Sequence, residues 1–203
     1  MTLTVGSFVT ARRLSTVSGA AVAVPDPDAV VHLQLRRFAG CPVCNLHLRS
    51  FARRNREVLR AGVREVVVFH SPAGELLPQV RDLPFAVVAD PRKQLYQEFG
   101  VESAKRALLD PRAWPAIVSG VRSSLWEIAR HRRPAPPRTP YGGRFGLPAD
   151  FLIASDGSVI AVKYGQHAND QWSVGELLTL AGRQRQASEP GDARPPVAPA
   201  PRK

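Results

Sequence analysis

Residues 31–44 read VHLQLRRFAGCPVC and hold both cysteines of the 203-residue chain. The run Val31 to Phe38 predicts a buried strand, and the segment Asn45 to Arg60 predicts a helix because its apolar residues recur at helical spacing. Two thiols at a strand–helix junction can pass between dithiol and disulfide, and a helix N-terminus favours the thiolate that attacks peroxides and disulfides. The motif Cys41-Pro42-Val43-Cys44 therefore predicts a thiol redox enzyme.

Other roles are open to two cysteines at this spacing. A structural disulfide is disfavoured, because a two-residue spacing closes almost no loop and removes little unfolded-state entropy. A zinc site needs four ligands, and His47 follows Cys44 at helical spacing, so a mixed metal site stays open. A covalent haem site requires a histidine directly after the second cysteine, where Asn45 stands. We expect redox chemistry that uses neither a cofactor nor a bound metal.

The composition fits one globular domain with a sizeable core. Hydrophobic residues make up 44% of the chain, and no apolar run approaches the roughly 20 residues that span a bilayer, so no membrane partner is expected. Residues 1–30 lack the charged start and the continuous apolar stretch of a signal peptide. We therefore expect a cytoplasmic protein, in a compartment where a close cysteine pair is more often catalytic than structural.

The formal net charge of +11 raises the question of nucleic-acid binding. The basic residues are scattered, however, and the densest patch, Arg130 to Arg138, stands in a proline-rich stretch without interleaved aromatic residues. No helix-turn-helix, RNA-recognition or zinc-finger pattern is present in the sequence. The charge indicates a solvated basic surface, and nucleic acid is not an expected partner.

The order of the expected elements predicts an α/β fold. A strand, a helix and a second strand follow one another from Val31 to Phe69, and such a unit places its strands parallel with a right-handed crossover. We expect, in chain order, a hairpin within Gly6–Val24, a strand at Val31–Phe38, a helix at Asn45–Arg60, a strand at Val63–Phe69, a helix at Glu75–Val80, a strand at Phe85–Ala89, a helix from Asp90-Pro91 to Phe99, a helix at Trp114–Ile128, a hairpin turning at Asp156-Gly157 and a helix at Val174–Ala181. This order is that of a thioredoxin-like three-layer sandwich with a mixed central sheet.

The predicted domain covers residues 1–183 and contains a helical, proline-rich insertion at about residues 103–146. An amphipathic helix is predicted inside the insertion, with its apolar side in the core or over the site. The residues that recur at spacings of four and three are Trp114, Val118, Val121, Leu125 and Ile128. Residues 184–203 are rich in proline, alanine and charge, and we expect them to be disordered.

Four segments of the chain match one known group of proteins in order and spacing. They are the early hairpin with Ser18-Gly19, the cysteine segment Phe38-Ala39-Gly40-Cys41-Pro42-Val43-Cys44, the run from Val87-Val88-Ala89-Asp90-Pro91 to Phe99-Gly100-Val101, and Leu147-Pro148-Ala149-Asp150-Phe151-Leu152-Ile153 with Asp156-Gly157. Together, over about residues 6–182, they resemble the peroxiredoxin-like branch of the alkyl hydroperoxide reductase/thiol-specific antioxidant (AhpC/TSA) family. Only the cysteine segment is specific by itself.

This resemblance implies a thioredoxin fold in which Cys41 is the attacking thiolate and Cys44 the resolving thiol, with Pro42 and Pro148 as supporting residues. It implies an antioxidant enzyme that reduces a hydroperoxide and is recycled by a thioredoxin or a low-molecular-weight thiol. Pro148 matches the position of the cis-proline of thioredoxin-like proteins, so we expect a cis bond before it.

The chain departs from the typical peroxiredoxin pattern at three positions. Phe38 stands where those proteins have a threonine, and Gln34 stands where they have a proline. Pro148 takes the place of an arginine at the start of the late strand, and Arg144 is near that place but not aligned with it. The resemblance therefore implies two-cysteine redox chemistry more strongly than efficient peroxidase activity.

Four basic side chains near the motif are candidate supporting residues. Strand alternation lets only one of Arg36 and Arg37 face the thiolate. His47 lies one helical turn after Cys44 and is a candidate to tune the pKa of that thiol. His70, at the end of a predicted strand, lies on the sheet edge where α/β folds place their sites.

Two other functions are compatible with the sequence. A protein disulfide reductase would use the same two thiols, since the motif does not set a reduction potential by itself. A non-enzymatic binding module would instead use the basic surface and the helix at Trp114–Ile128 as an interaction face.

Overall fold

The computed structural model describes residues 2–101, 110–130, 135 and 139–188. Its centre is a mixed five-stranded sheet with the strand order β5-β4-β3-β6-β7. The strands are β3 (Val30–Arg36), β4 (Val63–Phe69), β5 (Ala86–Ala89), β6 (Ala149–Ile153) and β7 (Val159–Tyr164). The central strand β3 pairs in parallel with β4 and antiparallel with β6, which confirms the predicted β-α-β unit.

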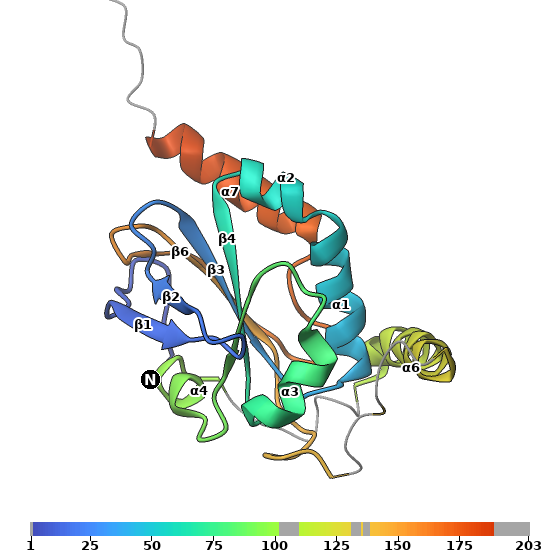
Figure 1. The fold of residues 1–203 in the computed structure, drawn as a ribbon. Helices are drawn as coiled ribbons and strands as arrows, with labels where there is room; N and C mark the ends of the chain where they lie inside the picture. Colours follow the sequence, from blue (N-terminus) through green and yellow to red (C-terminus); the bar gives the residue numbers. More distant parts are fainter. Residues whose placement is uncertain (1, 102–109, 131–134, 136–138, 189–203) are drawn as a thin grey trace, which may run out of the picture.

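Both faces of the sheet are covered, which gives the three layers predicted from the sequence (Figure 1). One face carries the helices α1 (Pro42–Arg53), α2 (Asn55–Arg60), α3 (Ala73–Val80) and α7 (Val174–Ser188). The opposite face carries the helix α4 (Gln94–Glu98) and the predicted N-terminal hairpin of β1 (Arg12–Ser15) and β2 (Ala21–Val24). The cysteine motif lies at the edge of the first face, where β3 ends and α1 begins.

The two sides of β3 differ in chemistry. All its residues after Val30 are buried. Val31, Leu33 and Leu35 belong to the apolar core under the hairpin and α4. The alternate residues are polar: His32, for example, packs its ring against Phe51 of α1. A strand with period-two alternation thus buries polar groups under α1 and α7 and apolar groups on the other side.

Several helix boundaries differ from the predicted ones. The helix after the cysteines begins at Pro42 instead of Asn45, and Arg54 separates α1 from α2. Asp90 caps α4 as predicted, but its carboxylate accepts from the N–H groups of Gln94 and Leu95, so the helix begins after Pro91. Helix α7 continues to Ser188, because residues 184–188 are good helix formers. The predicted disorder is therefore wrong for these residues, and 189–203 lie outside the described residues.

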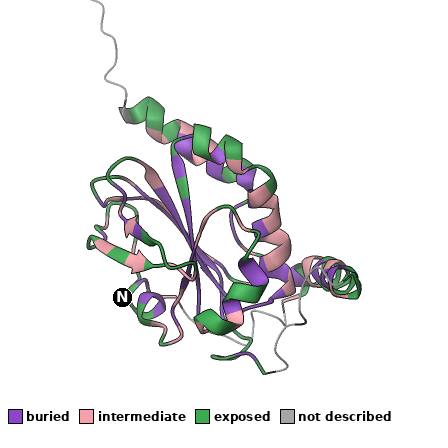
Figure 2. Cartoon of the chain, viewed as in Figure 1, coloured by how far each residue is buried: buried purple, intermediate pink, exposed green. Residues whose placement is uncertain are grey.

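The predicted amphipathic helix is present as α6 (Trp114–Ala129), after the short turn η1 (Pro111–Ala113), but the predicted burial of its apolar stripe is wrong. Most of its large apolar side chains are exposed, whereas Ile117 and Ile128 are half-buried and Gly120, Ser124 and Glu127 are buried. The helix packs on α1, and Figure 2 shows exposed residues on its side away from α1. The reason is that small residues allow two helices to approach closely. The flanking segments 102–109, 131–134 and 136–138 of the predicted insertion lie outside the described residues. Neither α6 nor another helix in the described part of the chain is long and apolar enough to cross a membrane.

Candidate active site

The two cysteines lie where β3 leads into α1. Gly40 has a φ of +74°, a backbone conformation that residues with a Cβ rarely adopt. The chain turns at Gly40, and Cys41 then takes the N-cap position of α1. Pro42 takes the first helical position, where its missing N–H costs no hydrogen bond. The backbone N–H of Cys44 donates to Sγ of Cys41 at 3.4 Å. Both cysteines are free and buried, so the motif forms one compact dithiol centre.

The surroundings of Cys41 favour its thiolate. Burial alone would raise the pKa of this thiol, but three effects outweigh burial: a hydrogen bond from the Cys44 thiol, the positive charge of Arg37, and the backbone N–H groups of Cys44 and Val43. The pKa of Cys41 falls from 9.0 to about 6. Burial, and then the hydrogen bond and charge of Cys41, raise the pKa of Cys44 well above 9.0. At neutral pH the centre therefore holds a thiolate on Cys41 and a thiol on Cys44.

Of the two arginines before the motif, Arg37 acts on the cysteines. It is buried, its guanidinium carbon lies 5.4 Å from the ring centroid of Phe38, and its charge lowers the pKa of both cysteines. Arg36 points the other way, and its Nη2 lies 2.5 Å from Oδ1 of Asp150. Strand alternation separates the two arginines as predicted, and it selects Arg37.

His70, directly after β4, lies beside Arg37 under the loop of residues 141–147. Its backbone N–H donates to the Arg37 carbonyl at 3.3 Å. Burial, followed by the charges of Lys93 and Arg37, lowers the pKa of His70 to about 4, so the ring is neutral at pH 7. We assign its proton to Nδ1, which lies 3.2 Å from the carbonyl oxygen of Tyr141. Among the described residues, His70 Nε2 and Arg37 Nε are buried without a hydrogen-bond partner. Because such atoms are costly to leave unpaired, they are candidate contacts for a bound polar group.

Pro148 stands directly before β6, but the expected cis bond is absent. In the described part of the chain the cis peptide bond is Val24–Pro25, so the bond between Leu147 and Pro148 is trans. The carbonyl of Pro148 accepts from the N–H of Gly165 at 2.9 Å. This bond extends the β6–β7 ladder by one step, and Pro148 therefore acts here as the first residue of an extended segment.

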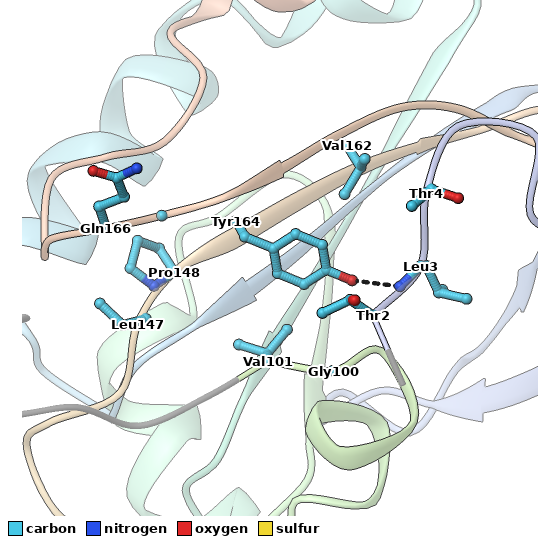
Figure 3. Close-up of a pocket in the computed structure, with 11 residues that line it drawn as sticks. Thr2, Leu3, Thr4, Gly100, Val101, Leu147, Pro148, Val162, Tyr164 and Gln166 are labelled. Atoms are coloured by element: carbon cyan, nitrogen blue, oxygen red, sulfur yellow. Dashed lines mark hydrogen bonds between the residues drawn. The ribbon is translucent and has the colours of Figure 1, made fainter.

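Two cavities, one beside Pro148 and one beside the cysteines, differ greatly in size. The larger measures about 480 Å³ and has Pro148 at one end, while Tyr164 accepts a hydrogen bond from the N–H of Leu3 at 2.8 Å at its other end (Figure 3). The cavity that touches Cys41 and Cys44 measures about 10 Å³, which is about the space of one water. The dithiol centre is therefore closed in this structure, and the larger cavity does not open onto it.

Behind α1, β3 contributes to a buried group that we call the β3 ionic cluster: His32, Arg36, Glu65 and Asp150. His32 lies 2.9 Å from Glu65 and 3.1 Å from Asp150. Burial lowers the pKa of His32, but the two carboxylates outweigh it and raise the pKa to about 9. Gln34 bridges the cluster through hydrogen bonds with Arg36 and Glu65. Each charge in the cluster has an opposite charge beside it.

The side chain of His47 contacts this cluster and not the cysteines. Its Nε2 lies 3.1 Å from Nη2 of Arg36, and the centroid of its ring lies 4.8 Å from the ring centroid of Phe51. Burial and then the charge of Arg36 lower the pKa of His47 well below 6.5. The candidate role of His47 in tuning the pKa of Cys44 is therefore not supported, because its side chain turns toward Arg36. Among the described residues, no group of three or more His, Cys, Asp and Glu side chains is placed to hold a metal ion.

Two hydroxyl groups that fix the site were not predicted. The Ser71 hydroxyl accepts from the backbone N–H of Ala39 at 2.9 Å, next to the motif. The Tyr96 hydroxyl donates to the carbonyl of Val68 at 2.9 Å and also contacts the Arg36 carbonyl. Both partners are backbone groups distant in sequence, so no local pattern identifies these side chains. They hold the ends of β3 and β4 in place below the cysteines.

Gly120 of α6 was also missed, although it touches the motif directly. A Cβ at this position would lie 2.9 Å from the carbonyl carbon and oxygen of Pro42, which is closer than real contacts allow. The sequence does contain a signal for this packing, since Gly120, Ser124 and Glu127 fall on one helical face at spacings of four and three. Helix α6 is therefore seated against the start of α1.

The fold and the dithiol centre together define a class. A mixed sheet covered on both faces, with two free cysteines at the start of the helix after the central strand, is the arrangement of thioredoxin-like thiol oxidoreductases. Residues 50–167 match the family described as AhpC/TSA antioxidant enzyme. The match spans more than half of the chain, and the chain belongs to this family. The matched region begins after Cys44, so the match establishes the family and not the roles of the two cysteines. A search of the curated proteins finds no match.

Solved structures share the fold over nearly the whole chain. Peroxidoxin BcpB from Mycobacterium tuberculosis has a TM-score of 0.59 at 16% identity, covering 90% of this chain and 96% of its own. A mutant of the peroxiredoxin 6 of Arenicola marina has a TM-score of 0.66 at 15% identity, with 95% and 80% covered. A putative thiol:disulfide interchange protein DsbE from Chlorobium tepidum has a TM-score of 0.55 at 17% identity, with 92% and 98% covered. At these identities the likeness establishes the fold, and it confirms the predicted thioredoxin-like sandwich.

Proposed function

We propose that the protein is an antioxidant thiol peroxidase that reduces hydroperoxides through a Cys41/Cys44 dithiol–disulfide cycle. The observation that supports this most strongly is the asymmetry of the two thiols. The pKa of Cys41 is lowered to about 6, and that of Cys44 is raised well above 9.0. One sulfur is therefore ready to attack at neutral pH, while the other keeps its proton until an intermediate has formed.

In the first step the Cys41 thiolate attacks the terminal oxygen of the hydroperoxide. An S–O bond forms as the O–O bond breaks, the sulfur loses two electrons, and the leaving alkoxide takes a proton to become an alcohol. Cys41 is left as a sulfenic acid. The Cys44 sulfur then attacks Cys41, an S–S bond forms, and the hydroxide leaves with the Cys44 proton as water. A two-residue spacing at a helix start keeps the second sulfur in reach of the first.

Arg37 and His70 supply polar groups at the place where the family pattern is altered. Phe38 and Pro148 hold the positions of the usual threonine and arginine, so the peroxide needs other partners. Arg37 Nε is a donor and His70 Nε2 an acceptor, both side chains lie against Gly146, and both atoms are unpaired among the described residues. A hydroperoxide group can accept from the first and donate to the second. Because the cavity at the cysteines holds about one water, the oxidant enters only after the covering residues move apart.

The disulfide formed in this cycle must be reduced by an external thiol. A yeast mitochondrial 1-Cys peroxiredoxin, similar in fold with a TM-score of 0.62 at 12% identity, is described as resolved through glutathione and thioredoxin systems. We propose the same kinds of reductant here, a thioredoxin or a low-molecular-weight thiol.

Steady-state turnover tests this proposal. The protein is assayed with hydrogen peroxide and with an organic hydroperoxide, with thioredoxin and its reductase or glutathione as the reductant. We expect peroxide consumption that depends on Cys41 and on the reductant. The proposal would be contradicted if the wild type consumed peroxide and reductant no faster than a Cys41→Ser variant.

A protein disulfide reductase is the second candidate. It is favoured by the Cys-Pro-Val-Cys spacing and by the fold shared with a protein described as a putative thiol:disulfide interchange protein. Insulin reduction, measured beside peroxide consumption on the same sample, separates the two candidates. Insulin reduction well above the uncatalysed rate, together with negligible peroxide turnover, would favour the reductase.

A further inference from the structure

The outer face of α6 exposes apolar side chains that the redox proposal does not use. Five large side chains on this one helix are between 39% and 61% exposed: Trp114, Val118, Val121, Leu125 and Trp126. Soluble proteins rarely expose a contiguous apolar stripe of this kind unless it meets a partner. We call this stripe the α6 outer face.

Helix α6 cannot simply roll over to bury its outer face. Gly120 lies directly against the backbone of Pro42, where even a Cβ would be too close. Oε1 of Glu127 lies 3.0 Å from Nε of Arg49, and its Oε2 accepts from Nδ2 of Asn45 at 3.4 Å. These contacts fix the small and polar side of the helix on α1. The α6 outer face therefore stays exposed, because the contacts on the opposite side of the helix hold it in this orientation.

The charges next to the stripe are positive. Arg122 lies on the α6 outer face, and Arg130, which follows the helix, places its guanidinium carbon 3.7 Å from the ring centroid of Trp126. The one carboxylate in the helix, Glu127, is turned inward to Arg49. The chain as a whole has a net charge of +11. A partner of this face must therefore be apolar and negatively charged.

An anionic lipid surface has both properties. Tryptophan and leucine side chains insert at the boundary between headgroups and acyl chains, while nearby arginines pair with the anionic headgroups. A second copy of the chain fits less well, because two such faces would bring like charges together. Trp114 and Trp126 agree with this partner as well, since the amphipathic ring of tryptophan sits at the headgroup level of a bilayer.

We propose that the α6 outer face binds to the surface of anionic membranes, a partner not expected from the sequence, with the helix lying in the plane of the interface and not spanning it. Because Gly120 is seated on Pro42, binding places the cysteine end of the molecule at the lipid surface. This inference is independent of the redox proposal and holds whatever the thiols reduce.

Vesicle sedimentation with the full chain tests the proposal. Vesicles of phosphatidylcholine alone are compared with vesicles that also contain phosphatidylglycerol. We expect binding to the anionic vesicles, much weaker binding to the neutral ones, and a decrease in binding as salt is added. A Cys41→Ser/Cys44→Ser double variant is expected to bind like the wild type, because the thiols take no part.

Two serine variants locate the surface. Leu125→Ser on the α6 outer face is expected to weaken binding roughly tenfold, the effect of withdrawing one leucine from the apolar interface. Leu59→Ser on α2 is the matched control, since Leu59 is also exposed (56%, against 61% for Leu125) and is expected to leave binding unchanged. Absence of binding to anionic vesicles, or equal losses in both variants, would overturn the proposal. So would a dimer in light scattering that Leu125→Ser dissociates, because a second copy would then cover the face.

Discussion

Two regions of the molecule, one along β3 and one just beyond its end, carry buried ionisable groups, and the charges in the two regions are paired to different degrees. Along the strand, the β3 ionic cluster surrounds each charge with an opposite one, as Asp150 is surrounded by His32 and Arg36. Beyond the end of the strand, the Cys41 thiolate is balanced by a hydrogen bond from the Cys44 thiol, by the charge of Arg37 and by the backbone N–H groups of Cys44 and Val43. Both regions are buried to a similar degree. They differ in how completely their charges are paired.

This difference separates structure from reactivity. A fully paired buried cluster has nothing left to offer a substrate, and removing one member leaves an uncompensated charge. A thiolate held by few partners is stabilised enough to form and is still available to attack. We therefore assign stability to the β3 ionic cluster and chemistry to the dithiol centre, and the following predictions test that division.

The largest expected effect is on activity at the dithiol centre. Cys41→Ser is expected to abolish turnover, lowering the rate by roughly a thousandfold or more, with the melting temperature nearly unchanged. Cys44→Ser is expected to leave a sulfenic acid on Cys41 that dimedone labels, detected by mass spectrometry. Labelling of Cys44 in the Cys41→Ser variant would reverse the assignment of the two roles.

The second effect is on stability at the β3 ionic cluster. Asp150→Ala is expected to lower the free energy of unfolding by about 3–5 kcal/mol, because Arg36 and His32 lose their shared partner. Asp82→Ala is the matched control: Asp82 pairs with Arg49 at the surface, and its loss is expected to cost less than about 1 kcal/mol. Urea unfolding measures both. Similar small losses in the two variants would show that the cluster does not stabilise the fold.

One part of the pH dependence of stability comes from His32. Its pKa rises from 6.5 to about 9 on folding, so its contribution is fully present below about pH 6.5 and is lost as the pH rises toward 9. At about 1.4 kcal/mol for each pKa unit, this contribution is roughly 3 kcal/mol. The Cys41 thiolate gains stability over the same range, because the pKa of Cys41 falls from 9.0 to about 6 on folding, so the His32 part is read as a difference between two proteins. The difference in unfolding free energy between the wild type and His32→Gln is expected to shrink between pH 6.5 and 9. A difference that stays constant over this range would show that His32 does not carry the effect.

The smallest effect concerns Arg37. Arg37→Gln is expected to raise the pKa of Cys41 by about one unit, because the thiolate loses its nearest positive charge. Iodoacetamide alkylation at different pH values, read at Cys41 by mass spectrometry, measures the change. Arg54→Gln, a surface change near the end of the same helix, is the control and is expected to leave the profile in place. An unchanged profile for Arg37→Gln would show that the helix N-terminus and Cys44 hold the thiolate without it.

The sequence was sufficient to predict the framework of the site. The run Val31–Phe38 followed by Cys41-Pro42-Val43-Cys44 carries strand and helix signals without conflict, and the parallel pairing follows from the crossover between them. The hairpin at Asp156-Gly157 has an equally local signal. Elements with such local signals can be predicted from the sequence because their formation depends on few contacts between distant residues.

Features that depend on distant partners could not be predicted. The phase of β3 decides whether Arg36 or Arg37 meets the cysteines, and only the register with Asp150 on β6 fixes it. His47 stands one turn from Cys44, yet Arg36 draws its side chain away. For α6, the apolar stripe predicted burial, but close contact with Pro42 required the face of Gly120 instead. In each case a tertiary contact outweighed a local rule.

The central claim is that Cys41 and Cys44 act as one redox pair in which Cys41 reacts first. The most direct measurement is the reaction of the reduced protein with one equivalent of hydrogen peroxide, followed by thiol counting and peptide mapping by mass spectrometry. We predict that both thiols disappear together and that a single intramolecular Cys41–Cys44 disulfide is found. Two free thiols after exposure to the oxidant would contradict the account.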